Sequence, residues 1–321
     1  MQKIAKIAAA AVLLLSVLCV DAQALQLEPV GKVVGLELQE GSVRIAAFDE
    51  RDGAAARSAG LAVGDTLVKI NDVRVTCAAD VKRALDRSHG SVTVELERGG
   101  QLHTTRLYPK ITADGPKLGL YLRQGTTGIG TVTWYDPSSG RFGTLGHGVN
   151  DGKGNLLSML GGSAYYARVN AVKKGKSGAP GQLLGAITDY TPAGELTANT
   201  ERGVFGISKT GWQEKAIEVA SRHEVKTGKA TIRTTVEGDS PREYSVEILK
   251  IYPKSRESGR NLLIKVTDPA LLEQTGGIVQ GMSGSPIIQD DKLVGAVTHV
   301  LVNDPTTGYG IFIENMLDAA A

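Results

Sequence analysis

The spacing of apolar and polar residues predicts a strand-rich segment over most of the chain. From about Leu118 to Leu317, short stretches of alternating or continuous apolar residues are separated by Gly, Asn and Asp. Strands at this density are typical of a β-barrel or a β-sandwich. The expected strands are residues 128–134, 183–187, 229–235, 244–251, 262–266, 286–288, 293–301 and 310–313, and residues 215–220 and 315–320 have short helical patterns.

The segment before it, from about Leu25 to Pro109, has a mixed pattern. Its most distinctive part is Ala59–Asn71, which reads AGL..GD.L..IN. The pattern predicts, in order, a short helix at 54–59, a strand at 67–70, an amphipathic helix at 77–88, and strands at 91–98 and 102–107 joined by a Gly-Gly turn. This order and the Ala59–Asn71 stretch resemble a PDZ domain.

The PDZ resemblance implies capture of a peptide or chain terminus along a strand edge beside a helix. The expected groove lies between a strand near Val43–Ala47 and the helix Cys77–Ser88. Leu36–Ser42 is a weak candidate for the loop that would bind a terminal carboxylate. The occupant is open among a substrate, a partner and the chain's own N-terminal segment.

The first 24 residues have the pattern of an export signal. Lys3 and Lys6 precede an apolar run from Ile7 to about Val20, and Ala22-Gln23-Ala24 supplies small residues where a signal peptidase cleaves. The alternative is an uncleaved membrane anchor, although the run is shorter than the roughly 20 residues of a comfortable span. The predicted organisation is therefore 1–24 signal peptide or anchor, 25–110 PDZ domain and 118–321 peptidase domain.

Charge and cysteine content narrow the function classes. The chain has 36 Lys and Arg against 34 Asp and Glu, a net charge of +2, with no basic block that would indicate nucleic-acid binding. Removal of a signal containing Cys19 would leave Cys77 as the one cysteine, so no intramolecular disulfide is expected. The Cys and His spacing of a zinc site is missing, and the sequence predicts neither a metal nor an organic cofactor.

The strongest chemical signal is Gly281-Met282-Ser283-Gly284-Ser285-Pro286, where a serine lies between glycines before an apolar strand. The glycines allow a tight turn in which the N–H groups of Gly281 and Ser283 converge as an oxyanion hole. Such a donor lowers the barrier of acyl transfer by about 3 kcal/mol. Ser283 is therefore the candidate nucleophile.

A serine nucleophile needs a general base, and His147 is the strongest of the histidines. It lies between Gly146 and Gly148 at a predicted strand end, and it precedes Ser283, as in chymotrypsin-like enzymes. His299, in the strand after the nucleophile, is interpreted as a wall of the specificity pocket or a supporting residue. The others are His89, His103 and His223.

The acidic member of a triad has two candidates. Asp189 follows an apolar stretch and lies 42 residues after His147, a conventional separation for this fold class. Asp268 lies only 15 residues before Ser283, and spacing alone does not favour it. Asp151 and Asp239 also lie between base and nucleophile, and Asp239 is in a polar turn.

Three segments closely resemble the stage IV sporulation protein B family of serine peptidases: residues 266–288 around the serine, Leu145–Gly148, and Thr298–Pro305. The resemblance implies a chymotrypsin-like double β-barrel with Ser283 as nucleophile, His147 as base and Asp268 as acid. It also implies export to the forespore intermembrane space, cleavage of a membrane-bound regulator of sigma-factor processing, and self-cleavage.

The expected function is thus an exported serine endopeptidase in sporulation signalling. Two alternatives stay open. The chain could be a catalytically inactive PDZ scaffold, in which the β-rich domain only binds. It could instead be a general envelope quality-control protease, although such proteases place the PDZ domain after the catalytic domain.

Overall fold

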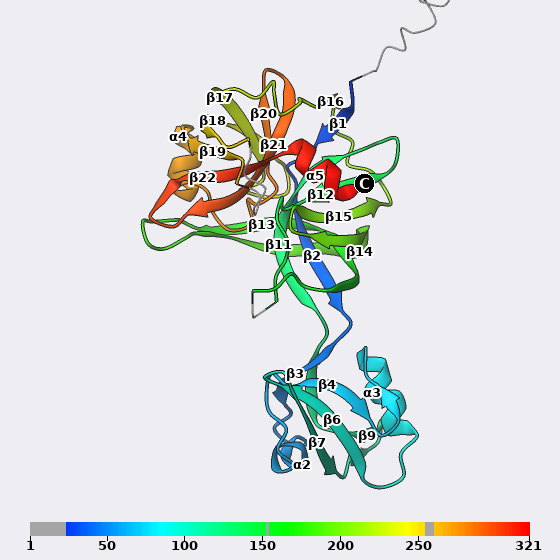
Figure 1. The fold of residues 1–321 in the computed structure, drawn as a ribbon. Coiled ribbons are helices and arrows are strands. Elements are labelled where there is room, and N and C mark those ends of the chain that lie inside the picture. Colours follow the sequence, from blue (N-terminus) through cyan, green and yellow to red (C-terminus); the bar gives the residue numbers. More distant parts are fainter. Residues whose placement is uncertain (1–23, 152–153, 254–259) are drawn as a thin grey trace, which may run out of the picture.

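The computed structural model describes residues 24–151, 154–253 and 260–321. Two closed six-stranded β-barrels lie next to each other, and a smaller α+β unit is joined to the first of them by two strands (Figure 1). This arrangement confirms the predicted mainly-β fold with a double barrel and a PDZ domain. The predicted export signal lies almost wholly outside the described residues.

The first barrel is an antiparallel sheet that closes when β11 pairs with both β2 and β12. Its core contains Val34, Leu36, Leu38 and Phe142, which are all buried. Two short strands, β1 (Gln26–Pro29) and β16 (Ile217–Glu218), extend the sheet beyond β11. The barrel strands are β2 (Val33–Glu40), β11 (Thr126–Tyr135), β12 (Arg141–Thr144), β13 (Met159–Lys173), β14 (Gln182–Thr200) and β15 (Gly203–Ser208).

The second barrel closes in the order β17-β18-β19-β22-β21-β20. Alternation is clear in β18, where Tyr244, Val246 and Ile248 are buried and their neighbours are exposed. Helix α4 (Pro269–Thr275) connects β19 to the nucleophile loop. The strands are β17 (Gly228–Thr234), β18 (Arg242–Ile251), β19 (Leu262–Val266), β20 (Pro286–Gln289), β21 (Lys292–Leu301) and β22 (Asp304–Phe312).

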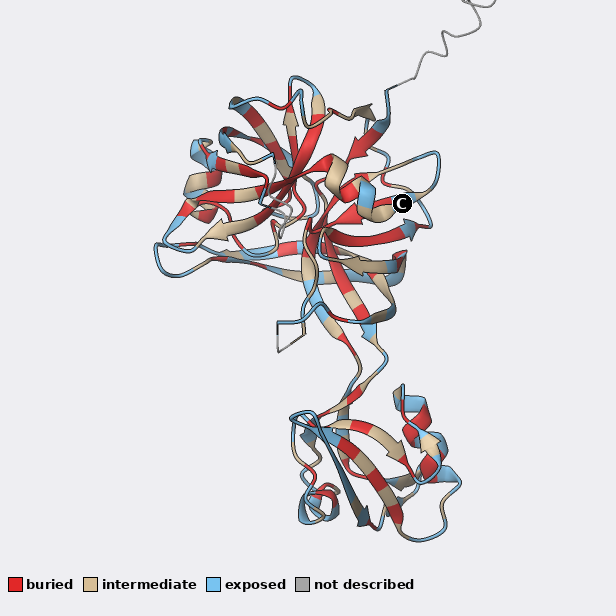
Figure 2. Cartoon of the chain, viewed as in Figure 1, coloured by how far each residue is buried: buried red, intermediate tan, exposed pale blue. Residues whose placement is uncertain are grey.

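A buried apolar cluster packs between the barrels and fixes their relation. It includes Trp134 and Phe205 of the first barrel, Leu293 and Ile311 of the second, and Met316 of helix α5 (Ile313–Ala320). Figure 2 shows buried segments continuing through this junction.

The two predicted short helices have different outcomes. Residues 315–320 lie in helix α5, whereas 215–220 contain the short strand β16, which pairs with β1.

The α+β unit is inserted between β2 and β11. It has its own core, in which Ile45, Leu67 and Ile70 pack against Val81 and Leu85 of α3. Its main sheet has the order β10-β3-β4-β6-β7. The elements are β3 (Val43–Phe48), α2 (Ala54–Ser58), β4 (Thr66–Ile70), β5 (Val73–Arg74), α3 (Ala78–Asp86), β6 (Val92–Arg98), β7 (Gln101–Leu107), β8 (Lys110–Thr112), β9 (Gly115–Lys117) and β10 (Leu120–Arg123).

This insertion changes the predicted domain boundaries. The predicted PDZ segment 25–110 includes residues 26–40, but β1 and β2 pair with β11, β13 and β16 of the first barrel. At the other end, β10 pairs with β3, so the PDZ unit extends to Arg123. A sequence pattern shows where strands occur but not which distant strand each one pairs with.

The predicted PDZ groove is also displaced. β3 lies inside the sheet between β10 and β4, and β10 occupies the edge. A cavity of about 450 Å³ lies beside α3 and the segment 114–122, where Val81 and Leu85 face Leu118, Leu120 and Leu122. The groove therefore runs along β10 and not along β3, and Leu36–Ser42 is not part of its lining.

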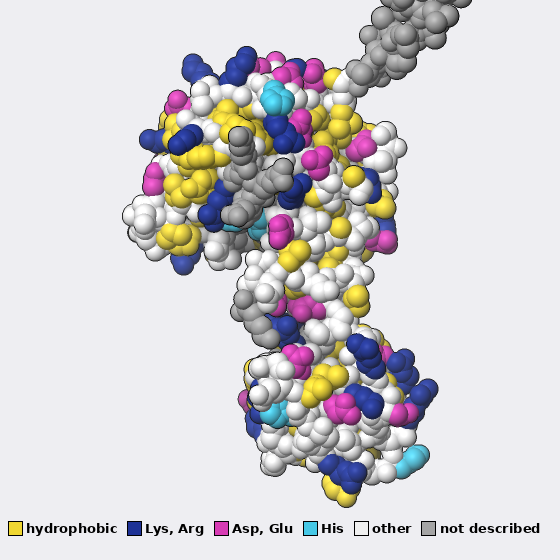
Figure 3. Space-filling model, viewed as in Figure 1, with side chains coloured by type: hydrophobic (Ala, Val, Ile, Leu, Met, Phe, Trp, Pro, Cys, Tyr) yellow, Lys and Arg dark blue, Asp and Glu magenta, His cyan; other side chains and the backbone are white. Residues whose placement is uncertain are grey.

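Acidic and basic side chains alternate over the surface seen in Figure 3, without a single-sign patch on that face. Within the part of the chain that the structure describes, no helix has the length and apolarity needed to cross a membrane.

Candidate active site

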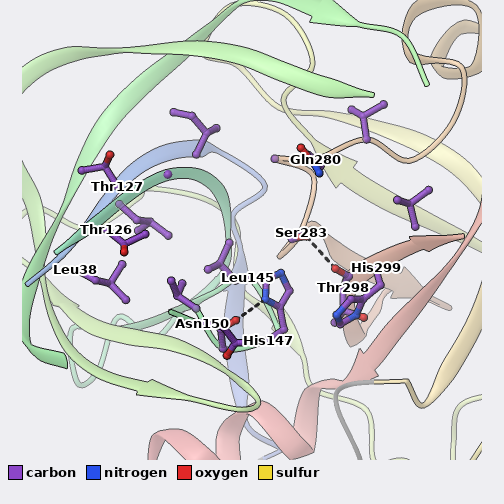
Figure 4. Close-up of a pocket in the computed structure, with 18 of the residues that line it drawn as sticks. Leu38, Thr126, Thr127, Leu145, His147, Asn150, Gln280, Ser283, Thr298 and His299 are labelled. Carbon is purple, nitrogen blue, oxygen red and sulfur yellow. Dashed lines mark hydrogen bonds between the residues drawn. The ribbon is translucent and has the colours of Figure 1, made fainter. Parts of the chain in front are cut away.

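A cavity of about 460 Å³ opens between the two barrels and brings the predicted nucleophile and base together. Ser283 and His147 both line it, although 136 positions separate them in the sequence. The first barrel contributes residues 36, 38, 126–129, 145 and 147–150, and the second contributes 278–281, 283 and 298–300. Figure 4 shows Ser283, His147 and His299 around this space.

The nucleophile loop depends on glycines for its shape. Gly281 and Gly284 have φ angles of +98° and +96°, a region that L side chains rarely adopt. A Cβ on Gly284 would lie 2.0 Å from the carbonyl oxygen of Thr131. Thr131 also fastens the loop to the first barrel, since its N–H donates to the Ser283 carbonyl at 3.0 Å and its hydroxyl to the Gly281 carbonyl at 2.8 Å.

The amides predicted to form the oxyanion hole have no acceptor among the described residues. The N–H groups of Gly281 and Ser283 make no hydrogen bond there, whereas the intervening Met282 N–H donates to the Val279 carbonyl at 3.1 Å. Two unpaired donors that flank a serine hydroxyl can stabilise the negative oxygen of a tetrahedral intermediate.

His147 reaches the second barrel through a tight loop after β12. Leu145 and Gly146 both have φ of +69°. A Cβ on Gly146 would come within 2.9 Å of the Thr298 side chain, so a larger residue would push the loop away from β21. The two glycines flanking His147 therefore serve close packing, and a sequence pattern alone does not reveal their contacts.

The imidazole of His147 is oriented by its own loop. Its Nδ1 lies 2.9 Å from the carbonyl oxygen of Gly148. Because a carbonyl only accepts, Nδ1 carries the proton and Nε2 is left as the basic nitrogen. Burial of the ring lowers the pKa of His147 below its usual 6.5, and the bond to Gly148 partly opposes this shift.

The Ser283 hydroxyl donates to the carbonyl oxygen of Thr298 at 2.9 Å, not to His147. The two catalytic candidates therefore share the cavity without a direct hydrogen bond in this state. A rotation about χ1 of Ser283 would release its hydroxyl toward the base. The Thr298 carbonyl was not predicted from the sequence, because a backbone oxygen carries no residue-type signal.

His299 lies next to the base, with ring centroids 5.1 Å apart and ring planes at 40°. Its Nδ1 is buried without a hydrogen-bond partner. Desolvation, with smaller contributions from His147 and Arg260, lowers the pKa of His299 to about 4. The ring is therefore neutral at pH 7, and it lines the cavity, as predicted for a pocket wall.

Neither acidic candidate is brought to this cavity. Asp268 is the N-cap of α4, where Oδ1 accepts from the N–H groups of Ala270 and Leu271 at 3.0 and 3.1 Å. Its Oδ2 accepts from the Ser245 N–H at 3.3 Å. Asp189 is exposed on β14 and accepts from the Thr191 N–H at 2.8 Å. The structure thus gives Asp268 a helix-capping environment in place of contact with His147.

Asn199 is a supporting residue that the sequence did not reveal. Its side chain accepts from the Val149 N–H at 2.9 Å and donates to the carbonyls of Val149 and Leu157 at 2.8 and 2.9 Å. These bonds fasten the loop after His147 to the end of β14. Their partners lie 42 to 50 positions away, so only the fold brings them together.

Within residues 24–151, 154–253 and 260–321, no group of three or more His, Cys, Asp or Glu side chains could hold a metal ion. The cavity brings together the Ser283 hydroxyl, the His147 imidazole and the loop that carries the Gly281 and Ser283 amides. That set matches nucleophilic acyl transfer.

Both modules of the chain match models of known protein families. A PDZ domain model matches residues 50–98. One similar solved structure is the inactive form of a serine-to-alanine mutant of Rv3671c from M. tuberculosis, at 14% identity, a TM-score of 0.33, and coverage of 60% of this chain and 81% of that one. No curated protein matches the sequence. The SpoIVB peptidase S55 model matches residues 115–317, well over half of the chain. The chain therefore belongs to the SpoIVB peptidase S55 family and is a serine peptidase.

Proposed function

We propose that the protein is an exported serine endopeptidase that cleaves a regulatory membrane protein in sporulation signalling and also cleaves itself. The observation that carries the peptidase chemistry is the shared cavity of Ser283 and His147. The neighbouring amides of Gly281 and Ser283 have no acceptor among the described residues. Family membership supports the sporulation role, because the resemblance covers the nucleophile segment and the base.

In the proposed reaction, Nε2 of His147 takes the proton of Ser283 as Oγ attacks the peptide carbonyl carbon. The carbonyl oxygen becomes negative and is held by the Gly281 and Ser283 amides. The imidazolium then protonates the leaving amine, and the peptide C–N bond breaks to leave an ester on Ser283. Water attacks this ester with His147 again as base, which releases the acid product and restores the serine.

The groove beside β10 supports binding of a peptide or chain terminus by the PDZ unit. β10 is an edge strand, so its outer N–H and C=O groups are available to a bound extended chain. The apolar side chains of Val81 and Leu85 from α3 line the other wall. Capture there would raise the local concentration of one substrate at the neighbouring peptidase.

The N-terminal pattern supports export across the cytoplasmic membrane. Two lysines, an apolar run and Ala22-Gln23-Ala24 are the parts of a secretory signal. In the sporulation setting this export leads from the forespore to the intermembrane space, where a membrane-bound regulator would be accessible. Retention of the segment would leave the enzyme anchored at that membrane.

Labelling with a fluorophosphonate tests the peptidase chemistry directly. We expect the purified wild type to be labelled, Ser283→Ala to be unlabelled and His147→Ala to be labelled far more slowly. Asp189→Ala is the matched control, because that exposed carboxylate lies outside the cavity. A folded wild type that is not labelled would favour the inactive scaffold instead.

Co-expression tests the target class. The wild type or Ser283→Ala is expressed with candidate membrane-bound regulators, and cleavage fragments are followed by immunoblotting. Fragments that depend on Ser283 support the proposal. Equal fragments with both forms, or none with any regulator, would contradict a regulatory role.

A further inference from the structure

In a chymotrypsin-like double barrel, the side chain of the residue whose carbonyl is attacked lies close to the nucleophile, on the second-barrel side of the cavity. Two backbone segments form this wall: residues 278–281 before the serine, and 298–300 on β21. Gly284 N–H donates to the Val297 carbonyl at 2.8 Å, which holds β21 against the nucleophile loop. A bound side chain next to Ser283 therefore meets both segments.

The cavity lining excludes a charged substrate side chain. Among the described residues that line it, none is Asp, Glu, Lys or Arg, and many are apolar, including Leu36, Leu38, Ile129, Ile278 and Val300. A charged group placed here would lose its hydration without gaining an ion-pair partner among the described residues that line the cavity. The residue before the cleaved bond is therefore uncharged.

His299 gives this wall a polar group. Its Nδ1 is buried and has no hydrogen-bond partner among the described residues. A proton on that nitrogen would be a buried, unpaired N–H, so the stable tautomer places the proton on Nε2. The ring lines the cavity, so Nε2–H is the donor that it offers to a bound side chain. The low pKa of His299 keeps the ring neutral at pH 7.

The neighbouring polar groups are less suited to this role. The Thr298 hydroxyl already donates to the Tyr309 carbonyl at 3.2 Å, and the Thr298 carbonyl accepts from Ser283. Thr126 and Thr127 lie on the first-barrel side of the cavity. Gln280 lies on the loop before the nucleophile and could accompany His299.

We propose that His299 determines specificity by donating a hydrogen bond from its imidazole to an uncharged substrate side chain that carries an oxygen acceptor. The preferred residue before the cleaved bond is one with a side-chain amide or hydroxyl, such as Gln or Thr. This inference rests on the proposed peptidase function and assigns the substrate class of the same site.

Isosteric peptide pairs test the proposal. An internally quenched peptide, based on a sequence cleaved from a proteome-derived library, carries Gln, Met, Thr, Val, Glu or Lys before the scissile bond. We expect kcat/KM for the wild type to be about tenfold or more higher for Gln than for Met, and for Thr than for Val. Cleavage should be weakest for Glu and Lys.

The variants test the residue itself. In His299→Phe we expect both ratios to fall to about one or below, because the ring volume stays and the donor is lost. His299→Gln keeps a donor and should keep a preference above one. His223→Phe is the matched control, since it makes the same exchange at an exposed histidine outside the cavity lining and should leave both ratios unchanged. Each ratio compares two substrates with the same enzyme preparation, so differences in the fraction of active enzyme between variants cancel.

The outcomes distinguish a failure of the His299 inference from a failure of the proposed peptidase function on which it rests. A folded wild type that is not labelled at Ser283 would contradict the peptidase function. A labelled enzyme that cleaves no library peptide, that favours Met and Val, or whose ratios survive His299→Phe would overturn the role of His299 alone.

Discussion

At the scale of single residues, the base works in an environment that favours its neutral form. His147 is partly buried at the edge of the cavity, its Nδ1–H donates to the Gly148 carbonyl, and the neutral His299 ring packs against it. Both rings are harder to protonate than a free histidine, because a charged ring would lose hydration. The charge of His147 lowers the pKa of His299 further.

This environment predicts the pH dependence of cleavage. A general base is active when unprotonated, so lowering the pKa of His147 extends activity to lower pH. We expect the acid limb of the kcat/KM profile to have its midpoint below pH 6.5, measured with an uncharged peptide substrate. A midpoint at or above 6.5 would show that the cavity favours the imidazolium.

The cap role of Asp268 gives a second prediction at this scale. Asp268→Ala removes the acceptor of the Ala270 and Leu271 amides, and we expect the free energy of unfolding to fall by about 1 kcal/mol. Asp268→Asn should retain most of the cap, since Asn is also a good N-cap residue.

Urea unfolding measures the stability, and the labelling rate of the folded fraction measures the chemistry. If Asp268 acts only as a cap, both variants keep a labelling rate close to that of the wild type. A loss of a hundredfold or more in Asp268→Asn, with stability unchanged, would restore Asp268 as the triad acid.

At the scale of elements, the nucleophile loop is held between two barrels by backbone contact. Gly284 faces the carbonyl of Thr131 and the backbone of Leu145 in the first barrel. Its N–H donates to the Val297 carbonyl on β21 of the second barrel, so both barrels contact this one position. The loop geometry is thus a property of the barrel junction, and its local sequence permits the turn without determining it alone.

Substitution of this glycine should be far costlier than substitution of an open one. For Gly284→Ala we expect a loss of at least about 3 kcal/mol in stability and no labelling, because a Cβ would lie 2.0 Å from the Thr131 oxygen. Gly178→Ala is the control, since Gly178 also has a positive φ, +79°, but nothing within 4 Å of the added carbon. It should cost about 1 kcal/mol, from strain alone. Thermal unfolding that gives equal losses would refute the packing argument.

Much of the element scale could be predicted from the sequence. The strands at 229–235, 244–251 and 262–266 follow the alternation of buried and exposed residues, and the glycines of the serine loop indicate a tight turn. Ser283 and His147 lie in distinctive glycine contexts, so the residue pattern alone was enough to predict that they lie in one site.

Pairing partners and backbone contacts could not be predicted in the same way. The pattern of β2 does not show that its neighbours are β11 and β13, which lie beyond an inserted domain. Asp268 has the residue type of a triad acid, and only the folded chain shows that its oxygens face the start of α4. The Thr298 and Gly148 carbonyls are backbone groups that every residue has, so the sequence does not indicate their hydrogen bonds to Ser283 and His147.

At the scale of the whole molecule, the PDZ unit enters and leaves through neighbouring strands. Leu38 of β2 pairs with Thr126 of β11, and Arg44 of β3 pairs with Arg123 of β10. The two connecting segments are therefore adjacent at the barrel and again at the PDZ unit, as Figure 1 shows. Removing the insert leaves two chain ends that a short turn can join.

Excision of the insert should leave a folded peptidase. Replacement of residues 41–125 by a short Asn-Gly-containing turn keeps β2 and β11, and we expect Ser283 to be labelled still. Deletion of residues 25–109 is the contrasting control, because it removes β1 and β2 and opens the first barrel. Circular dichroism and labelling distinguish the two shortened proteins. An unfolded 41–125 replacement would show that the barrel depends on the insert.

The same excision separates two roles of the PDZ unit. If the groove captures substrate, the shortened enzyme should cleave its membrane target more slowly and small peptides normally. If the groove holds the enzyme's own N-terminal segment, self-cleavage should become faster. An unchanged rate with both would contradict a role of the groove in either process.

The two strands that connect the PDZ unit also form part of the catalytic cavity, through Leu36, Leu38 and residues 126–129. β10, the edge strand of the peptide groove, is followed after Gln124 and Gly125 by β11. A ligand that adds a strand to β10 would therefore act on β11, whose first residues form part of the cavity wall. We expect binding at the PDZ groove to change the width of the catalytic cavity, although the PDZ ligand does not contact Ser283.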